Sequence, residues 1–214
     1  IRRGEAKAVW AALRDIHQDP LYTFPWILEQ DRQVKKAEPI YFVKRTRGRG
    51  YDYPQYCLHG RDWRRLKHML RHNNVYLGVH GSYYGSIPAI EYSKMYRAHY
   101  LRCSIEQLQR LADAGYTDDF TMGFADQAGF RLQTCRAVRW INPKTMQLTN
   151  LTLHPLIVMD TTLSKYMHLT EDEAYFLCER LIAKVKLHHG DLCLLWHNNN
   201  FASESYHRAL YPKI

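Results

Sequence analysis

The chain has 214 residues, and 46% of them are hydrophobic. This length allows one sizeable core, so we expect a single domain over residues 1–214. The 30 lysines and arginines outnumber the 21 acidic residues, which gives a formal net charge of +9 and raises the question of a polyanionic partner. No apolar stretch approaches the roughly 20 residues needed to cross a bilayer, so we expect no membrane span.

The cysteines argue for a reducing environment. All five are scattered without a paired short spacing, which speaks against a zinc ribbon and against a disulfide framework. Cys178 and Cys193 lie in apolar runs and are typical of small buried side chains. This usage favours a reducing compartment, and we expect a cytoplasmic location.

The positive charge is concentrated in one region of the first half of the chain. The residues are Arg45, Arg47, Arg49, Arg61, Arg64, Arg65, Lys67 and Arg71. Part of this region falls on a predicted helix, and a solvated helix face explains most of the charge. A nucleic-acid partner is therefore not favoured and remains a third hypothesis for the function.

Predicted helices and strands alternate along the first half of the chain. Residues 23–34 form a predicted helix whose first turn tolerates Pro25, and residues 39–43 form a predicted strand. Apolar residues recur at three- and four-residue spacing over 61–72, which predicts a second helix. It leads into an apolar run, residues 75–80, that predicts a strand with a histidine at its end.

Two capping patterns mark helices in the second half. Ser104 and Gln107 form a candidate capping box for a helix that ends near Gly115. Thr170 and Glu173 repeat the pattern at the start of a longer helix. The expected inward positions are Ile105, Leu108, Leu111 and Ala112 in the first helix and Ala174, Leu177, Leu181 and Val185 in the second, which extends to about Leu187.

Strand patterns complete the second half of the chain. A strand-rich part that includes residues 151–159 lies between the two helices, and an apolar run after Gly190 predicts a strand leading to His197. The alternation predicts an α/β protein with a largely parallel sheet. Reactive side chains collect at the carboxyl ends of such strands, so His80 and His197 are the first candidates for chemistry. The alternative is that each histidine only bonds a backbone carbonyl.

Several short stretches, taken in order over nearly the whole chain, make up a pattern. They are DP at 19–20 with TFPWIL at 23–28, GVHGSY at 78–83, RAHYLR at 97–102, DFTMGFAD at 119–126, GFR at 129–131, MDTTL at 159–163 and LWHN at 195–198. With this set the chain resembles the polysaccharide deacetylases of the NodB-homology type, and more closely an uncharacterised bacterial branch found with genes for cell-surface polysaccharides. The resemblance implies a distorted (β/α) barrel whose site lies at the carboxyl ends of the strands.

The resemblance also implies a reaction. A divalent metal, for which we expect zinc, polarises an acetamide and activates water, while an aspartate acts as base and a histidine protonates the leaving amine. His80 matches the first metal-ligating histidine, Arg97 the arginine that orients the basic aspartate, and His197 the general acid. Asp119 is a candidate catalytic carboxylate, although Asp118 and Asp119 are equally typical of a turn.

Two departures from the family pattern bear on catalysis. The position four residues after the first metal histidine holds Tyr84, and a neutral phenol is a poor zinc ligand. His99 is a candidate for the missing metal ligand, with a supporting role beside the ligands as the alternative. The family's first motif is a pair of aspartates, but Asp15 is the one aspartate in residues 1–18. We therefore expect this motif, and the first barrel strand with it, to lie upstream of Ile1.

Aromatic and polar residues around the expected site are candidates for substrate binding. They are Tyr83, Tyr100, Trp196, Asn198 and Arg131. Arg131 has a second interpretation, as the partner of Asp160 in a buried pair that supports the barrel.

The leading hypothesis is a metal-assisted hydrolase that removes an N-acetyl or similar acyl group from a sugar or a cell-surface glycan precursor. The alternative is a barrel that has lost the metal and binds glycan without catalysis. The tyrosine at position 84 favours this alternative.

Overall fold

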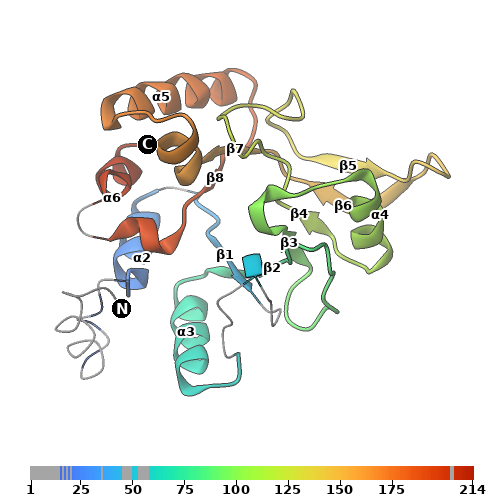
Figure 1. The fold of residues 1–214 in the computed structure, drawn as a ribbon, viewed down its shortest axis with the longest axis horizontal. Helices are drawn as coiled ribbons and strands as arrows, with labels where there is room; N and C mark the ends of the chain where they lie inside the picture. Colours follow the sequence, from blue (N-terminus) through green and yellow to red (C-terminus); the bar gives the residue numbers. More distant parts are fainter. Residues whose placement is uncertain are drawn as a thin grey trace.

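The computed structural model describes residues 15, 17, 19, 21–34, 36–44, 50–52, 58–202 and 205–214. Within them it shows an α/β protein with a mostly parallel, mixed six-stranded sheet in the order β1-β2-β3-β4-β6-β5 and a two-stranded sheet of β7 and β8 (Figure 1). The strands are β1 Ile40–Lys44, β2 Tyr76–His80, β3 Met95–Arg97, β4 Asp118–Asp119, β5 Val138–Ile141, β6 Leu148–Leu153, β7 Leu156–Met159 and β8 Cys193–Leu195. The predicted α/β class is confirmed, and β5 is the strand that pairs antiparallel, with β6.

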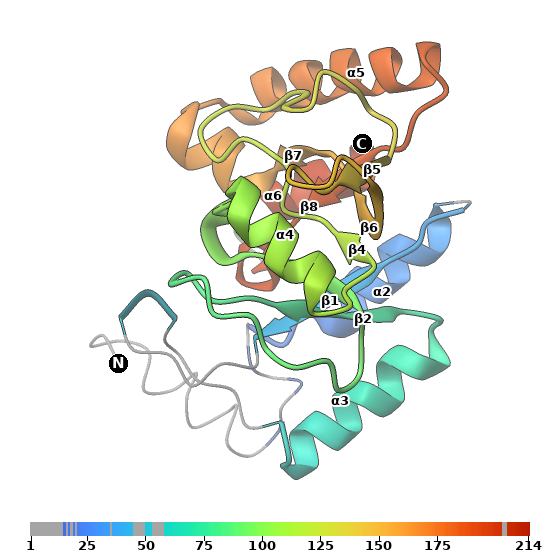
Figure 2. The same ribbon diagram turned by 90° about the vertical axis from the view of Figure 1, so that its right-hand side faces the viewer.

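Helices lie on the outside of these sheets, with α5 on the side of β7 and β8 and α3 on the side of β1 and β2 (Figure 2). The α-helices are α2 Phe24–Gln33, α3 Arg61–His72, α4 Ile105–Asp113, α5 Glu171–Leu187 and α6 Tyr206–Leu210. Short helical turns connect them: η2 Gly50–Asp52, η3 His99–Leu101, the π-helical η4 Thr162–Tyr166, η5 Asn198–Phe201 and η6 Tyr211–Lys213. Among the described residues, none of these helices is both long and apolar enough to cross a membrane.

The two helices predicted in the first half are confirmed. α2 has Thr23 as its N-cap and a proline in its first turn, as expected from the fixed backbone angle of proline. α3 has the predicted bounds, and its apolar stripe buries Trp63 and Leu70. α3 then leads directly into β2, which ends at His80 as predicted.

The cap of α4 forms only in part. The Ser104 side chain accepts a hydrogen bond from the backbone N–H of Gln107 at 3.1 Å. The Gln107 side chain does not return to the cap and donates instead to the Tyr96 hydroxyl at 3.4 Å. Leu108 and Leu111 are buried as predicted, but the inward placement of Ile105 was wrong, because the core does not extend to the first turn of the helix.

α5 begins with a complete capping box. The Thr170 side chain accepts from the Glu173 backbone N–H, and the Glu173 carboxylate accepts from the Thr170 backbone N–H. The buried stripe of this helix packs in one core cluster with two residues of β7, Ile157 and Val158. The members of the stripe are Ala174, Cys178, Leu181 and Val185.

One predicted strand is divided in two at Pro155, which lies between β6 and β7. Proline has no amide hydrogen and interrupts a strand ladder. The amides of His154 and Leu156 donate to the carbonyl oxygens of Asp119 at 2.8 Å and Met122 at 3.0 Å. The chain at β4 and just beyond therefore bonds to β6 and then to β7, which joins the two sheets. Closure of this surface into a barrel is not shown by the described residues.

Candidate functional site

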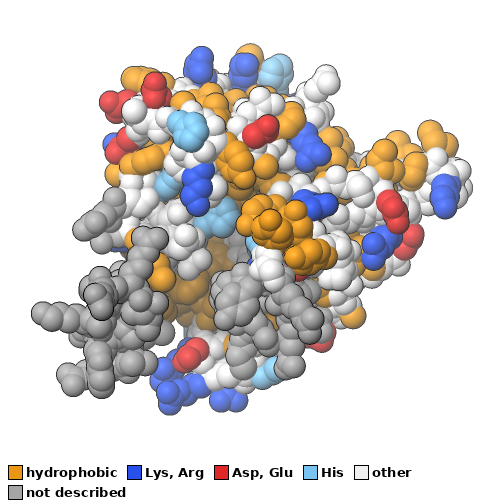
Figure 3. Space-filling view, in the orientation of Figure 1, with side chains coloured by type: hydrophobic (Ala, Val, Ile, Leu, Met, Phe, Trp, Pro, Cys, Tyr) orange, Lys and Arg blue, Asp and Glu red, His pale blue; other side chains and the backbone are white. Residues whose placement is uncertain are grey.

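A cavity of about 1790 Å³ opens along β1 and β8. Its wall includes residues at the carboxyl ends of parallel strands: Lys44 of β1, His80 of β2, Arg97 of β3, and His197 two residues beyond β8. His99, two residues after β3, lies in the same wall. Figure 3 shows a recess at the centre of one face, with hydrophobic side chains at its floor and histidine beside it. His80, Arg97, His99 and His197 thus line the same cavity, the first three at or just after the ends of adjacent strands of the six-stranded sheet and His197 just after a strand of the two-stranded sheet.

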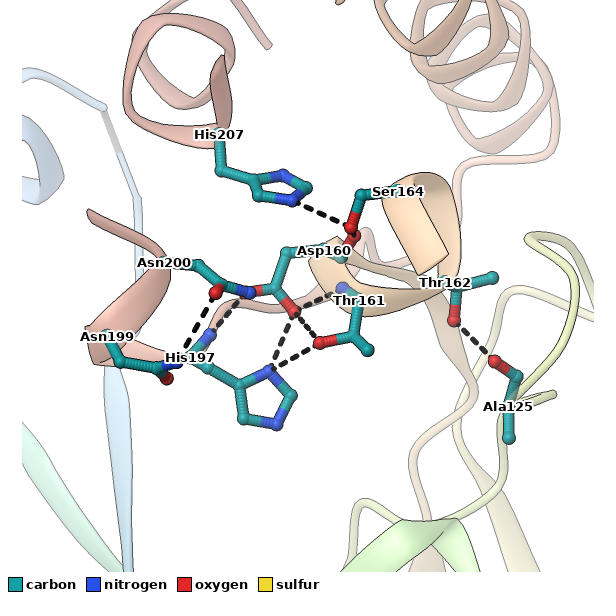
Figure 4. Close-up of polar contacts among 9 residues, drawn as sticks. All are labelled: Ala125, Asp160, Thr161, Thr162, Ser164, His197, Asn199, Asn200 and His207. Carbon is teal, nitrogen blue, oxygen red and sulfur yellow. Dashed lines mark hydrogen bonds and ion pairs between the residues drawn. The ribbon is translucent and has the colours of Figure 1, made fainter. Parts of the chain in front are cut away.

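His197 is held by Asp160, a fully buried carboxylate just after β7 (Figure 4). Asp160 Oδ1 lies 2.7 Å from His197 Nδ1, and Asp160 Oδ2 accepts from the His197 backbone N–H at 2.6 Å. The Thr161 amide donates to Oδ1 at 2.6 Å, and the Asn200 side chain donates to Oδ2 at 2.9 Å. Because a carboxylate only accepts, the His197 proton is on Nδ1 and the neutral ring has its lone pair on Nε2.

The charge of Asp160 is fixed by these donors. Burial by itself would raise the pKa of Asp160, but the hydrogen bonds and charge of His197, with the Asn200 amide, outweigh burial and lower the pKa below its usual value. Asp160 is therefore ionised at neutral pH. The His197 side chain is 43% exposed and lines the cavity, so a fixed negative charge lies against an accessible imidazole.

A second layer of contacts holds the backbone around Asp160 (Figure 4). The Ser164 hydroxyl donates to the Asp160 backbone carbonyl at 3.3 Å, and Nε2 of the buried His207 lies 3.0 Å from that hydroxyl. The Thr162 hydroxyl donates to the carbonyl oxygen of Ala125 at 2.8 Å. The turn η4 that follows Asp160 is therefore tied to α6 and to the loop after β4, which fixes the position of the carboxylate.

His80 and His99 form a second group of imidazoles, with ring centroids 5.0 Å apart. His80 Nδ1 lies 3.2 Å from the carbonyl oxygen of Gly81, and His99 Nδ1 lies 3.1 Å from Asp52 Oδ1. These acceptors place the proton of each neutral ring on Nδ1, so each Nε2 carries the lone pair. Burial lowers the pKa of His80 to about 3 and also lowers the pKa of His99, so both rings are neutral at pH 7.

His80 and His99 are the residues expected to bind zinc, and both rings are neutral. Neutral imidazole is the form that zinc binds, and a carboxylate behind the ring, as Asp52 is behind His99, commonly orients a metal-bound histidine. However, the part of the chain that the structure describes contains no group of three or more His, Cys, Asp or Glu side chains placed to hold an ion. Tyr84 is exposed, and its hydroxyl lies against Gly50. His80 and His99 therefore stay predicted ligands, and the described residues do not supply a third one beside them.

Arg97 is a buried cation in the cavity wall. Its Nε donates to the Phe120 carbonyl oxygen at 3.1 Å, and its guanidinium carbon lies 4.2 Å from the centre of the Phe42 ring. Burial lowers the pKa of Arg97 from its usual value. Its predicted role, which is to orient a basic aspartate, needs a carboxylate inside the cavity.

Asp119 does not line the cavity, although its neighbour Asp118 does. The Asp119 carboxylate is fully buried and accepts from the Thr121 amide at 3.1 Å and from the Thr121 hydroxyl at 2.6 Å. Burial raises the pKa of Asp119 to about 6. The interpretation of these two aspartates as a turn was wrong, because they form β4 and pair with β3 and β6.

The predicted substrate-binding residues are divided between two places. The Tyr100 ring lies 4.6 Å from the His99 ring and 5.5 Å from the Tyr83 ring, so these two tyrosines lie beside the histidines. Trp196 lines the cavity and packs against Tyr211, with ring centroids 5.4 Å apart.

Asn198 and Arg131 are engaged elsewhere. Asn198 lines the cavity with an exposed side chain, and its carbonyl oxygen accepts from the Thr23 hydroxyl at 3.0 Å. Arg131 donates to the carbonyl oxygen of Gly123 at 3.0 Å. The expected pair of Arg131 with Asp160 was wrong, because Asp160 is satisfied by the donors around His197.

Sequence reasoning missed three members of this site: Asp52, Asn200 and the role of Asp160 toward His197. Asn200 belongs to a run of three asparagines directly after His197, and this polar run at a strand end was a usable signal. Asp52 lies 47 residues from His99 in a short helical turn, and no pattern in the sequence links the two.

No protein-family model matches this chain, and neither a curated protein nor a solved structure matches it. The family resemblance therefore stays a prediction.

Proposed function

We propose that this protein is a hydrolase that removes an N-acetyl or similar acyl group from a sugar or glycan. The observation that carries the proposal is the pair of His197 and Asp160, in which a buried, ionised carboxylate fixes an accessible imidazole in the wall of a large cavity. A histidine oriented in this way is the usual form of a general acid or base. The neutral imidazoles of His80 and His99 line the same cavity.

The proposed role of His197 follows from the reaction. When the carbon–nitrogen bond of an acetamide breaks, the leaving amine must gain a proton. In its imidazolium form, with protons on both nitrogens, His197 donates the Nε2 proton to the amine and becomes neutral, while Asp160 holds Nδ1–H, fixes the ring orientation and stabilises the imidazolium. Asn200 and the Thr161 amide keep Asp160 in place and ionised.

We also propose zinc as the cofactor, with His80 and His99 as two of its ligands. A bound divalent ion polarises the acyl carbonyl and lowers the pKa of a bound water. The proposal depends on further ligands that the described residues do not supply.

The second candidate function is a glycan-binding protein without catalysis. The position of Tyr84 favours it, because this residue stands where the family has a metal ligand and its side chain is exposed. Purified protein incubated with N-acetylated oligosaccharides separates the two functions. Release of acetate together with a free amine supports the hydrolase, and glycan binding without release supports the second candidate.

We further propose that the two sheets belong to one (β/α) barrel, which an additional strand closes between β1 and β8. All residues of 39–44 and of 190–199 line the cavity. Successive side chains of a strand point to opposite faces, so a cavity that contacts all of them lies along the edge of the strand. Such an edge presents backbone N–H and C=O groups that can bind another strand.

Hydrogen exchange of the β1 amides tests the barrel in the intact protein. In a parallel strand alternate amides point to opposite sides, and β2 protects one set. If a strand occupies the cavity, the other set is protected to a similar degree. Exchange of that set at the rate of an unstructured peptide contradicts closure.

A further inference from the structure

A buried lysine in the cavity wall has no part in the proposed reaction. Lys44 is the last residue of β1, is 8% exposed and lines the cavity. Among the described residues, its ammonium group makes no hydrogen bond and no ion pair. An ammonium carries three N–H donors, and lysine is almost never buried unless a partner satisfies them. The position of Lys44 therefore calls for an acceptor inside the cavity.

The strand register places Lys44 in one row with two other residues of the wall. Lys44 of β1 pairs with His80 of β2, and His80 pairs with Arg97 of β3. Residues opposite each other on neighbouring strands point to the same face of the sheet, and the strands are about 4.8 Å apart. Besides burial, the positive charges of Arg97 and Lys44 also lower the pKa of His80, so the three groups are close enough to interact. A ligand in front of His80 is thus within reach of the ammonium.

The carboxylate of Asp52 attracts Lys44 but does not satisfy its donors. Asp52 does not line the cavity. Its oxygens accept from the Ser82 hydroxyl, the Tyr83 amide and His99 Nδ1. Burial lowers the pKa of Lys44, and the negative charge of Asp52 opposes this effect only in part. A further negative charge at the ammonium is therefore favourable.

A singly charged group suits this position better than a doubly charged one. Lys44 and Arg97 line the cavity, whereas Asp52 and Asp119 lie behind its wall. Despite burial, the hydrogen bonds of Asp52 lower its pKa, so it is ionised at neutral pH, and Asp119 has a pKa of about 6. These carboxylates repel a second negative charge on a ligand. A carboxylate carries one negative charge, and a phosphate monoester carries nearly two at pH 7.

We propose that Lys44 binds a carboxylate group of the ligand, and that the substrate of this site is an acidic sugar of the uronic acid class. The ammonium donates to the carboxylate oxygens beside His80. The assignment of the ligand as a sugar rests on the proposed function, whereas binding of a carboxylate by Lys44 does not. A ligand at this place is compatible with the strand proposed along the β1 edge, because ligands of a barrel bind at the carboxyl ends of its strands.

The test uses three N-acetylated sugars that differ in the group at C6. N-acetylglucosamine has a neutral hydroxymethyl group, N-acetylglucosaminuronic acid has a carboxylate, and N-acetylglucosamine 6-phosphate has a phosphate. We measure affinity by calorimetry in the His197→Asn background, in which turnover does not interfere, and the uronic acid should bind most tightly.

The decisive variant adds Lys44→Met. It should weaken binding of the uronic acid about 30-fold or more, because the ligand carboxylate loses its charged partner in a buried place. It should change binding of N-acetylglucosamine less than about 2-fold. Lys36→Met is the matched control and should change neither affinity, because Lys36 lines the same cavity but is exposed.

A stability measurement distinguishes a ligand carboxylate from a carboxylate of the chain itself. Without ligand, Lys44→Met should unfold at the same urea concentration as the parent protein or at a higher one, because the change removes a buried charge that has no partner. A lower urea midpoint means that a carboxylate of the protein holds Lys44, and this result contradicts the proposal.

Three binding results would also overturn the proposal: equal affinity for the uronic acid and the neutral sugar, an unchanged affinity for the uronic acid in Lys44→Met, or an equal loss in Lys36→Met. Tighter binding of the 6-phosphate than of the uronic acid, lost in Lys44→Met, overturns it in favour of a phosphate. The proposed function fails separately. Uronic acid binding through Lys44 without acetate release keeps the assignment of Lys44 and removes the hydrolase, whereas acetate release from N-acetylglucosamine as efficient as that from the uronic acid does the reverse.

Discussion

Two histidine–aspartate pairs at the cavity wall have nearly the same length but different surroundings. His197 Nδ1 lies 2.7 Å from Asp160, and His154 Nε2 lies 2.8 Å from Asp118. Both histidines line the cavity. The distance between imidazole and carboxylate therefore does not distinguish the two pairs. The surroundings of the two pairs distinguish them.

The two carboxylates differ in burial, and the two imidazoles differ in whether Nε2 is already bonded to an aspartate. Asp160 is fully buried and accepts from several donors, whereas the Asp118 side chain is 29% exposed and also accepts from the Thr117 hydroxyl. His197 offers Nε2 to the cavity, but His154 uses Nε2 for its aspartate and is stacked on Phe120, with ring planes 6° apart. A buried carboxylate on Nδ1, with Nε2 facing the cavity, distinguishes His197–Asp160 from His154–Asp118. His99 and the buried Asp52 share this arrangement, and His99 is the proposed zinc ligand.

The largest expected effect is on turnover. His197→Asn should lower acetate release by roughly 10²–10⁴-fold, because the leaving amine loses its proton donor. His154→Asn should retain most of the activity. Initial rates and thermal midpoints on the same preparations test this. Equal losses in the two variants would remove the distinction between the pairs, and a fully active His197→Asn would end the hydrolase proposal.

The next effect is on stability. Asp160→Asn leaves the buried donors around His197 without their charged acceptor, so the free energy of unfolding should fall by about 3–5 kcal/mol. Asp118→Asn changes a partly solvated pair and should cost less than about 1 kcal/mol. Urea unfolding at pH 7 measures both values. Similar costs would show that the burial of Asp160 does not strengthen its pair.

The two fully buried carboxylates, Asp160 and Asp119, should respond to pH in opposite directions. The pKa of Asp119 is raised to about 6, so its contribution makes the free energy of unfolding fall by about 2–3 kcal/mol as pH rises from about 4 to about 6. Asp119→Asn should remove this fall. The pKa of Asp160 is lowered, so its stabilisation is present above pH 4 and is lost as pH falls through the folded value. Urea unfolding between pH 3 and 7 distinguishes them, and a parallel response of the two asparagine variants would contradict the assignments.

The smallest expected effect concerns zinc. His80→Ala should weaken zinc binding about 10-fold or more, because it removes a nitrogen lone pair from the proposed site. His154→Ala should not, since His154 Nε2 is bound to Asp118. Calorimetric titration of both variants after chelator treatment measures this. Equal zinc affinity in His80→Ala and the parent protein would rule out His80 as a ligand.

The helices and their caps could be predicted from the sequence, while the shortest strands could not. The bounds of α3 and the capping box of α5 follow from local periodicity and from side chains three residues apart. β3 has three residues and β4 has two, and runs this short cannot display the alternation of a strand. The strand signals of residues 151–159 show the same limit, because they predict neither the division at Pro155 nor the bonds to β4 and the loop after it that join the two sheets.

The residues that follow strands could be predicted from the sequence. The partners that these residues contact in the folded protein could not. His80 and Arg97 lie side by side because the parallel strands β2 and β3 end at one edge of a sheet, whereas His197 follows β8 of the second sheet. The choice of His197 as the partner of Asp160, in place of Arg131, is made by packing around η4. The contact of Asp52 with His99 likewise arises only in the folded protein.

The strand edges that border the cavity also bear on how the protein behaves in concentrated solution. A strand edge without a partner strand is a template for backbone pairing with another molecule, and two such edges among the described residues, those of β1 and β8, border the cavity. Because these two edges are different surfaces, copies that pair through them form open chains rather than closed dimers. If no strand of the protein itself fills the cavity, light scattering should therefore grow steadily with protein concentration, and an extended peptide that fills the cavity should suppress it. If the proposed barrel strand fills it, scattering should not grow.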